Sequence, residues 1–486
     1  MSATVTLDTP AKATSVHSLR LHSHGAPAPP AADPPAHSRA NAIPEKHHWI
    51  KEAACHATML IAGWSDASSG PLIPYIQEHY GVSYTVVSML FIGQAVGFLA
   101  AAGAMYLLVD RFGLGKVIVL GAALQATAYT FLIPAFPFPV FPILYCVSGF
   151  GMAIQDSMAN VYVATLPNAD RKLGFLHASY GAGAALCPLA ATAFASHYPT
   201  HFTKFWTISL FIALLNVCVL LYAFRFNYVL DTSEPTSEPE DESARPPSPR
   251  EEVALEAQTP PLDGSSMKSF NADTPSIRYP PDTNTLRRVQ KKEKSIFMQS
   301  LTSRTTILAS IFILFYVGSE VSMGGWIVTF LIDNRNGGPS AGYVATGFWL
   351  GLTVGRAVLN PLNRLVGPKR VIYFYLAAAL ALEFAVWFAD SLIGNAIVVS
   401  LIGVLIGPLY PIVMSLITQL LPRKLHGPSI AFTAAFGQCG SAIFPFVTGA
   451  LAQRFSPAVL QPVMVVLFAA QFLIWIAVPN VDHKKD

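Results

Sequence analysis

Twelve long apolar segments divide this chain of 486 residues, and each is long enough to cross a bilayer. About 20 apolar residues form a helix that spans the hydrocarbon and satisfies its own backbone hydrogen bonds there. The segments lie near residues 52–78, 84–109, 115–136, 138–166, 172–197 and 204–226, and then near 306–332, 341–363, 370–390, 392–421, 427–452 and 457–478. The sequence therefore predicts an all-α membrane protein with twelve transmembrane helices in two six-helix halves.

Composition supports a membrane protein and excludes several function classes. Only 12% of the residues are charged, against about a quarter in soluble domains. The net charge of +3 is too small and dispersed for a nucleic-acid partner. The five cysteines lie in apolar segments without a CxxC pair, so we expect no disulfide framework, metal site or cofactor. No HExxH, GxSxG or Walker loop is present, which argues against an enzyme or an ATP-driven pump.

The regions outside the apolar segments have a different composition. The start of the chain is rich in Ala, Pro, Ser and His and lacks the apolar centre of a signal peptide, while the middle is rich in Pro, Ser, Glu and Asp. Neither can bury a core. We predict a disordered cytoplasmic arm at 1–49, six-helix bundles at 50–226 and 306–478, a disordered cytoplasmic linker at 227–305, and a cytoplasmic tail at 479–486.

The basic residues of the short loops predict the orientation, because cytoplasmic loops carry an excess of Lys and Arg. With the N-terminus inside, nine such residues fall in inner loops and three in outer loops. The inner ones are Arg111, Lys116, Arg171, Lys172, Arg364, Lys369, Arg370, Arg423 and Lys424, and the outer ones are Lys204, Arg335 and Arg454. We therefore expect both termini in the cytoplasm.

The two halves repeat each other in sequence. Gly174 and Pro188 flank a glycine-rich stretch that recurs between Gly427 and Pro445, at a separation of 253 to 257 residues. Repeated membrane bundles of this kind are typical of secondary transporters, whose solute binds near the midplane between the halves.

The loop after the second apolar segment carries a family signature. Its residues Asp110, Arg111, Gly113 and Lys116 resemble the signature loop of the major facilitator superfamily, although Tyr106 stands where that family usually has a glycine. The resemblance implies the major facilitator fold, and it implies that these residues brace the helices during alternation between inward-open and outward-open states.

Two further stretches are similar to the fucose-permease-like branch of that superfamily and its fungal members. They are the run from Tyr316 to Trp326 and the pair Gly355-Arg356. Arg356 is the main cation inside the helices. It either pairs with an acid and locks one conformation, or extends its head to the lipid headgroups.

Two acids occupy equivalent places in the halves. Asp66 and Glu320 are 254 residues apart, which matches the repeat, and each precedes helix-breaking residues such as Gly70 and Gly324. An ionisable residue inside a bilayer is expensive and is a functional candidate for that reason. By family resemblance both helices line the central cavity, and the breakers indicate an opened backbone beside each acid. The alternative is a structural acid that caps a kink.

A second polar cluster lies in the segment 138–166. Asp156 and Asn160 are one helical turn apart and so share a face, and Gln155 adjoins them. This cluster either handles solute or protons, or makes a buried hydrogen bond between helices. Other candidates for the cavity wall are Gln94, Trp326, Tyr410 and Gln438, while His177 and Tyr180 are as well explained by packing and Glu383 is expected to pair with a neighbour.

These residues together predict a proton-coupled secondary transporter. Three dehydrated carboxylates, Asp66, Asp156 and Glu320, cannot all stay ionised without partners, so proton binding is expected there. The solute is then a small neutral or cationic organic molecule, either a sugar-like compound taken up or a fungal metabolite exported. We expect a monomer in the plasma membrane that binds solute, protons and lipid. The alternative function is a transport-inactive sensor that signals through its cytoplasmic linker.

Overall fold

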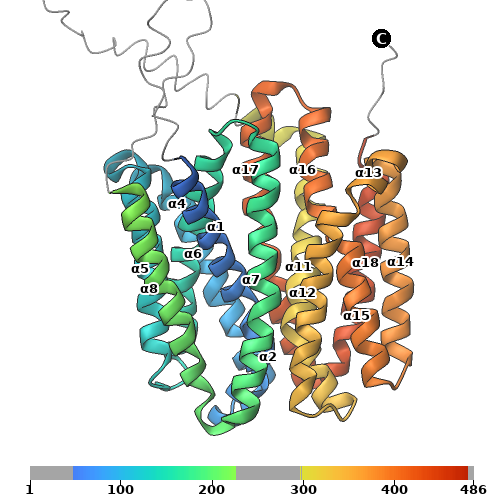
Figure 1. Cartoon of the computed structure of the whole chain (residues 1–486). Coiled ribbons are helices and arrows are strands. Elements are labelled where there is room, and N and C mark those ends of the chain that lie inside the picture. Colours follow the sequence, from blue (N-terminus) through green and yellow to red (C-terminus); the bar gives the residue numbers. More distant parts are fainter. Residues whose placement is uncertain (1–47, 226–295, 297, 480–486) are drawn as a thin grey trace, which may run out of the picture. The chain divides into compact units, whose positions relative to one another are not determined.

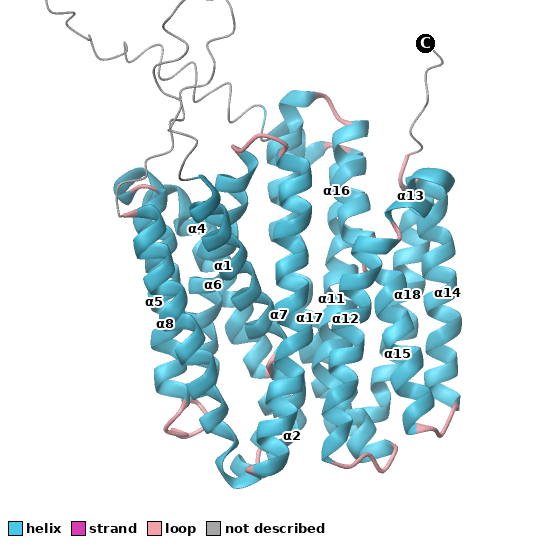
Figure 2. Cartoon of the chain, in the orientation of Figure 1, coloured by secondary structure: helices cyan, strands magenta, loops and turns pink. Residues whose placement is uncertain are grey.

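The computed structural model describes residues 48–225, 296 and 298–479. The predicted tail and most of the predicted arm and linker lie outside these residues. At the end of the predicted linker, residues 298–302 are helical, and the hydroxyl groups of Ser300 and Ser429 lie 2.8 Å apart. Every regular element in the described ranges is a helix, as Figure 2 shows.

The N-terminal half contains six transmembrane segments. Its elements are α1 (His48–Ala67), α2 (Ser69–Tyr80), α3 (Tyr84–Val87), α4 (Met89–Phe112), α5 (Leu114–Leu132), α6 (Val140–Ala164), α7 (Ala169–His197), η3 (Pro199–Lys204) and α8 (Phe205–Phe224). One residue separates α1 from α2 and α3 from α4, so each of these pairs forms a single interrupted segment.

The C-terminal half repeats this order. Its elements are α11 (Arg304–Asn334), η5 (Pro339–Gly342), α12 (Tyr343–Val358), α13 (Asn360–Val366), α14 (Pro368–Phe388), α15 (Leu392–Ile406), α16 (Leu409–Leu420), α17 (Arg423–Arg454), η6 (Pro457–Val459) and α18 (Leu460–Ala477). Figure 1 shows this half from yellow to red and the N-terminal half from blue to green.

In the described part of the chain, nine helices are long and apolar enough to cross a membrane. Three further segments complete the two sets of six: α1 with α2, α6, and α12 with α13. These three carry Asp66, Asp156 and Arg356. Polar residues make α1 and α6 less apolar, whereas α12 has only 16 residues before the chain is interrupted at Leu359. The predicted all-α membrane fold with twelve helices in two halves is confirmed.

Two loops show that the halves share one backbone plan. Gly113 ends α4 with φ 77°, and Gly367 ends α13 with φ 88°. Glycine adopts this left-handed backbone without the clash that a Cβ atom would cause. The two glycines are 254 residues apart, which is also the spacing of Asp66 and Glu320. The repeat seen in the sequence is therefore present in the backbone.

The halves cross closely at another equivalent pair of glycines. Gly70 in α2 lies against Gly324 in α11, and a Cβ atom on Gly70 would lie only 2.2 Å from the Gly324 carbonyl oxygen. These glycines are again 254 residues apart, so the helices meet at matching positions. Asp66 and Glu320 each precede this crossing by one helical turn. The acids therefore flank the point where the halves touch.

The halves are also joined at the side of the bundle away from the chain ends. We call the side where α1 begins and α18 ends the terminal side, and the other the distal side (Figure 1). At the distal side the Tyr84 hydroxyl donates to Asp333, and the Tyr84 amide donates to Gln453 Oε1 at 2.9 Å. Because Tyr84 belongs to the N-terminal half and both partners to the C-terminal half, these contacts close the bundle there.

Candidate functional site

A cavity of about 470 Å³ lies between the two halves. Residues of α1, α2, α4, α6 and α7 line one wall, and residues of α11, α12, α16 and α17 line the other. The lining reaches toward the terminal side through Met105 on α4 and Ala431 on α17, each of which lies near that end of its helix. Its volume falls within the range of small-molecule sites. The cavity can therefore hold one small solute.

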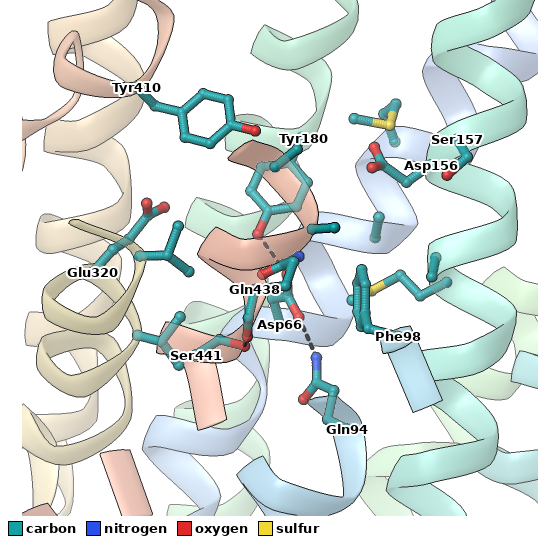
Figure 3. Close-up of a pocket in the computed structure, with 18 of the residues that line it drawn as sticks. Asp66, Gln94, Phe98, Asp156, Ser157, Tyr180, Glu320, Tyr410, Gln438 and Ser441 are labelled. Carbon is teal, nitrogen blue, oxygen red and sulfur yellow. Dashed lines mark hydrogen bonds between the residues drawn. The ribbon is translucent and has the colours of Figure 1, made fainter. Parts of the chain in front are cut away.

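Asp66 is held on the cavity wall by two uncharged groups. Gln94 Nε2 in α4 donates to Asp66 Oδ1, and the Tyr180 hydroxyl in α7 donates to Oδ2 at 2.6 Å (Figure 3). Among the described residues no Lys, Arg or His forms an ion pair with Asp66. The charge of this carboxylate therefore has hydrogen-bond partners and no compensating cation.

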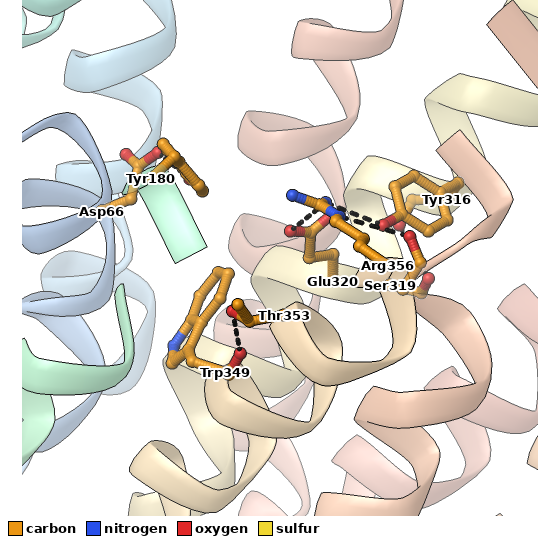
Figure 4. A network of polar contacts seen from close by, with 9 residues as sticks. Asp66, Tyr180, Tyr316, Ser319, Glu320, Trp349, Thr353 and Arg356 are labelled. Carbon is orange, nitrogen blue, oxygen red and sulfur yellow. Dashed lines mark hydrogen bonds and ion pairs between the residues drawn. The ribbon is translucent and has the colours of Figure 1, made fainter. Parts of the chain in front are cut away.

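Glu320 has a different environment on the opposite wall. Its Oε1 lies 3.5 Å from Nη2 of Arg356 in α12, and the same nitrogen donates to the Tyr316 hydroxyl at 3.3 Å (Figure 4). Arg356 Nε also donates to the Gly407 carbonyl oxygen at 3.2 Å. The structure thus selects the ion pair among the two expectations for Arg356. Since both partners belong to the C-terminal half, this pair does not itself join the halves.

Asp156 lies on the wall contributed by α6, across the cavity from Glu320 in Figure 3. Its Oδ1 accepts a hydrogen bond from Asn160 Nδ2 at 3.0 Å. In the described ranges it has no ion-pair partner. Asp156 therefore resembles Asp66 in having only a neutral partner.

The rest of the wall combines aromatic rings with hydrogen-bonding groups. The predicted residues Tyr410 and Gln438 both line it (Figure 3). His177 and Tyr180, for which packing was an equal alternative, also line it. Sequence reasoning missed other wall residues, whose types carry no distinct signal in an apolar helix: Phe91, Phe98, Ser157, Trp349 and Ser441.

Three predicted site residues lie away from the cavity wall. Gln155 is buried and donates to Gln125. Adjacent residues of a helix point about 100° apart, so Gln155 points away from the cavity that Asp156 lines. The Asn160 side-chain amide donates a hydrogen bond to the Asp156 carboxylate. Trp326 is buried and its Nε1 donates to the Pro445 carbonyl oxygen at 2.9 Å. These side chains support the wall rather than face the cavity.

The predicted opening of the backbone beside both acids is found only in part. The helix is interrupted at Ser68, two residues after Asp66. In contrast, α11 continues without interruption from Arg304 to Asn334, through Glu320 and the glycines that follow it. The expectation for Glu320 was wrong because glycine permits a helix as well as a break, and close packing against α2 holds this segment helical.

The signature loop lies at the terminal side, away from the cavity. Asp110 and Arg111 are exposed in the last turn of α4, Gly113 forms the turn, and Lys116 is exposed in the first turn of α5. In the part of the chain that the structure describes, these charged side chains form no ion pair. Their predicted role in conformational switching stays a prediction.

Comparison with known proteins identifies the family. The model of the Major Facilitator Superfamily matches residues 56–427, which includes most of both halves. The chain belongs to the Major Facilitator Superfamily. The family resemblance of the signature loop is thereby confirmed, and the chain is a membrane transporter rather than an enzyme.

Relatives and one solved structure cover nearly the whole transporter. It is 25% identical over 450 residues to "Bypass of stop codon protein 6" of Saccharomyces cerevisiae, covering 88% of this chain and 82% of the relative. It is 18% identical over 396 residues to the glucose/mannose transporter GlcP of Bacillus subtilis, covering 81% and 86%. The crystal structure of a D-xylose-proton symporter matches with a TM-score of 0.65 and 12% identity, covering 90% of this chain and 99% of that one. The likeness to the symporter structure shows that the two chains share one fold.

Proposed function

We propose that this transporter moves a neutral sugar-like solute together with protons, by alternating exposure of the central cavity. The observation that carries the proposal is Asp66, a carboxylate on the wall of the solute cavity with hydrogen-bond partners but no cation. Relatives named as a glucose/mannose transporter and, by fold, a D-xylose-proton symporter support the same solute class.

The cavity wall suits a hydroxylated ring. Rings of Phe98, Trp349 and Tyr410 offer flat apolar surfaces, against which the CH faces of a sugar can pack. Gln438 and Ser441 offer both donors and acceptors for hydroxyl groups. Since the one Arg on the described wall, Arg356, is already paired with Glu320 and no Lys lines that wall, a carboxylate or phosphate solute would lack a free Lys or Arg as partner.

Asp66 can gain a proton without breaking an ion pair. A side-chain amide and a phenol each serve as donor or acceptor, so Gln94 and Tyr180 can hold either the carboxylate or the acid. Tyr180 is followed by Gly181, where a Cβ atom would lie 2.2 Å from Thr353 Oγ1 of the other half. A change in the hydrogen bond to Tyr180 therefore acts next to an interface between the halves.

The described conformation fits one step of alternating access. Contacts of Tyr84 with Asp333 and Gln453 close the distal side, while the cavity lining extends toward the terminal side. With the basic residues concentrated in terminal-side loops, we propose that this side faces the cytoplasm. A tag at residue 20 should then resist external protease in intact cells. Cleavage of the tag would show that the terminal side faces the outside instead.

Transport in proteoliposomes tests the proposed function. Purified full-length protein is expected to accumulate at least one labelled hexose or pentose above equilibrium when the outside is made acidic. A protonophore should abolish the accumulation, because it removes the driving force, and protein-free liposomes should show none. Uptake that equilibrates but ignores the pH gradient would exclude proton coupling. If no sugar enters the liposomes and none stabilises the protein, the result would favour the alternative function, a transport-inactive membrane sensor.

A further inference from the structure

The C-terminal half contains a second set of buried polar groups, outside the solute cavity. Glu383 in α14, Asn395 in α15 and Gln461 in α18 each have 0% of their surface exposed. In the described part of the chain, neither carboxylate oxygen of Glu383 has a hydrogen-bond partner, and neither do the amide oxygen and nitrogen of Asn395 and Gln461. Such groups cost several kcal/mol each when buried without a partner, so they call for a ligand.

The packing of α14 on α18 brings Glu383 and Gln461 to one level. Lys369 Nζ in α14 donates to the Trp475 carbonyl oxygen in α18, which fixes the register of this antiparallel pair. Glu383 follows Lys369 by 14 residues, and Gln461 precedes Trp475 by 14. Since 14 residues make almost four helical turns, both side chains return to the interface at the same height.

Asn395 enters the same layer from α15. Glu383 lies five residues before the end of α14 at Phe388, and Asn395 three residues after the start of α15 at Leu392. At about 1.5 Å per residue these depths from the distal side differ by about 3 Å. Asn395 also lies on the buried stripe of α15 with Val399 and Ile402. Because α14 packs on α15, the amide and the carboxylate belong to one layer of the bundle.

A hydroxyl group of α11 lies at this level as well. Gln471 Nε2 in α18 donates to Ser319 Oγ in α11 at 3.3 Å, which fixes the register of a second antiparallel pair. Thr329 follows Ser319 by ten residues and Gln461 precedes Gln471 by ten, so the two are level. Thr329 is 1% exposed and its hydroxyl has no partner among the described residues.

We propose that Glu383, Asn395, Gln461 and Thr329 bind one sodium ion. One carboxylate neutralises one positive charge, whereas a divalent ion would leave an excess charge in the apolar interior. Amide carbonyls, a hydroxyl and a carboxylate are hard oxygen ligands, which suit such a cation. The Arg335 side chain, at the same side of the bundle, is committed to Asp390 at 2.9 Å and to the Trp387 carbonyl oxygen at 2.8 Å.

This site is separate from the solute cavity. None of the cavity-lining residues belongs to α14, α15 or α18. However, α18 packs on α11, the helix that carries Glu320 on the cavity wall. A bound ion would therefore hold α14, α15 and α18 against α11. Its binding can be measured without any solute.

Ion binding to the full-length protein in sodium-free choline buffer tests the site. Wild-type protein in nanodiscs is expected to bind one radioactive sodium ion per chain, and sodium should raise its thermal unfolding temperature more than equal potassium. Glu383→Gln should lose both responses. Glu78→Gln removes an exposed carboxylate of the N-terminal half and should keep both.

Variants of the neutral ligands keep the test valid if Glu383→Gln does not fold. Asn395→Leu and Gln461→Leu each remove one ligand and should weaken sodium binding by about tenfold. The proposal is overturned if wild-type protein binds no labelled sodium and Glu383→Gln is at least as stable, since Glu383 is then a buried neutral acid. Undiminished sodium binding by folded Glu383→Gln would overturn it equally.

Discussion

Arg356→Met is expected to destabilise the transporter severely and to abolish solute uptake. The substitution removes the cation that lies 3.5 Å from Glu320, and Glu320 itself is only 7% exposed. Breaking a buried ion pair from one side typically costs about 3–5 kcal/mol, because the remaining charge is left uncompensated. The Tyr316 hydroxyl and the Gly407 carbonyl oxygen lose a hydrogen bond from the same side chain.

A double variant separates this charge effect from loss of shape. Thermal unfolding of purified protein should show that Arg356→Met with Glu320→Gln recovers most of the lost stability, since no buried charge remains. Uptake should stay absent, because both groups line the cavity. Arg364→Met, on an exposed residue of α13, should change stability by no more than about 0.5 kcal/mol. If Arg356→Met alone unfolds like the wild type, the ion pair contributes nothing.

The twelve helices could be predicted because the bilayer demands long apolar runs, and these runs are visible in one sequence. The interruptions inside them were predicted only in part, because the break after Asp66 was expected and those at Ser88 and Leu359 were not. The run 52–78 contains both α1 and α2, and the break at Ser68 involves a single residue with nearly helical φ and ψ. Pro71 lacks the backbone N–H that would donate to the Ala67 carbonyl oxygen, which explains this break. In contrast, α11 stays helical through Gly324, because glycine keeps its N–H.

The acids of the site were found because a charge in an apolar run is conspicuous. Their partners were not, because partners depend on which helices pack together. Tyr180 donates to Asp66 across 114 residues. Arg356 was expected either to pair with an acid or to reach the headgroups, and the sequence did not show that Glu320 is the acid it pairs with. Trp326 was misplaced for a related reason: α11 is apolar nearly all round, so its sequence does not show which face meets the cavity.

Asp66→Asn is expected to abolish uphill transport driven by a pH gradient and to preserve solute exchange at equal pH. The amide keeps the shape and the hydrogen bonding to Gln94 and Tyr180, while it removes the group that takes up the proton. Exchange can proceed without release of the proton, so it should survive. Both modes are measured in proteoliposomes with the sugar that the wild-type protein accumulates, at matched protein content.

The two modes distinguish three roles for Asp66. A residue that only binds solute should weaken accumulation and exchange together, and one that only caps a kink should lower the amount of folded protein while sparing both. Glu78→Gln, at an exposed acid of α2 in the same transmembrane segment, should behave as wild type. If Asp66→Asn still accumulates solute against its gradient, the proton binds elsewhere. Asp156 is then the next group to replace, because it is the other cavity acid in the described residues without an ion-pair partner.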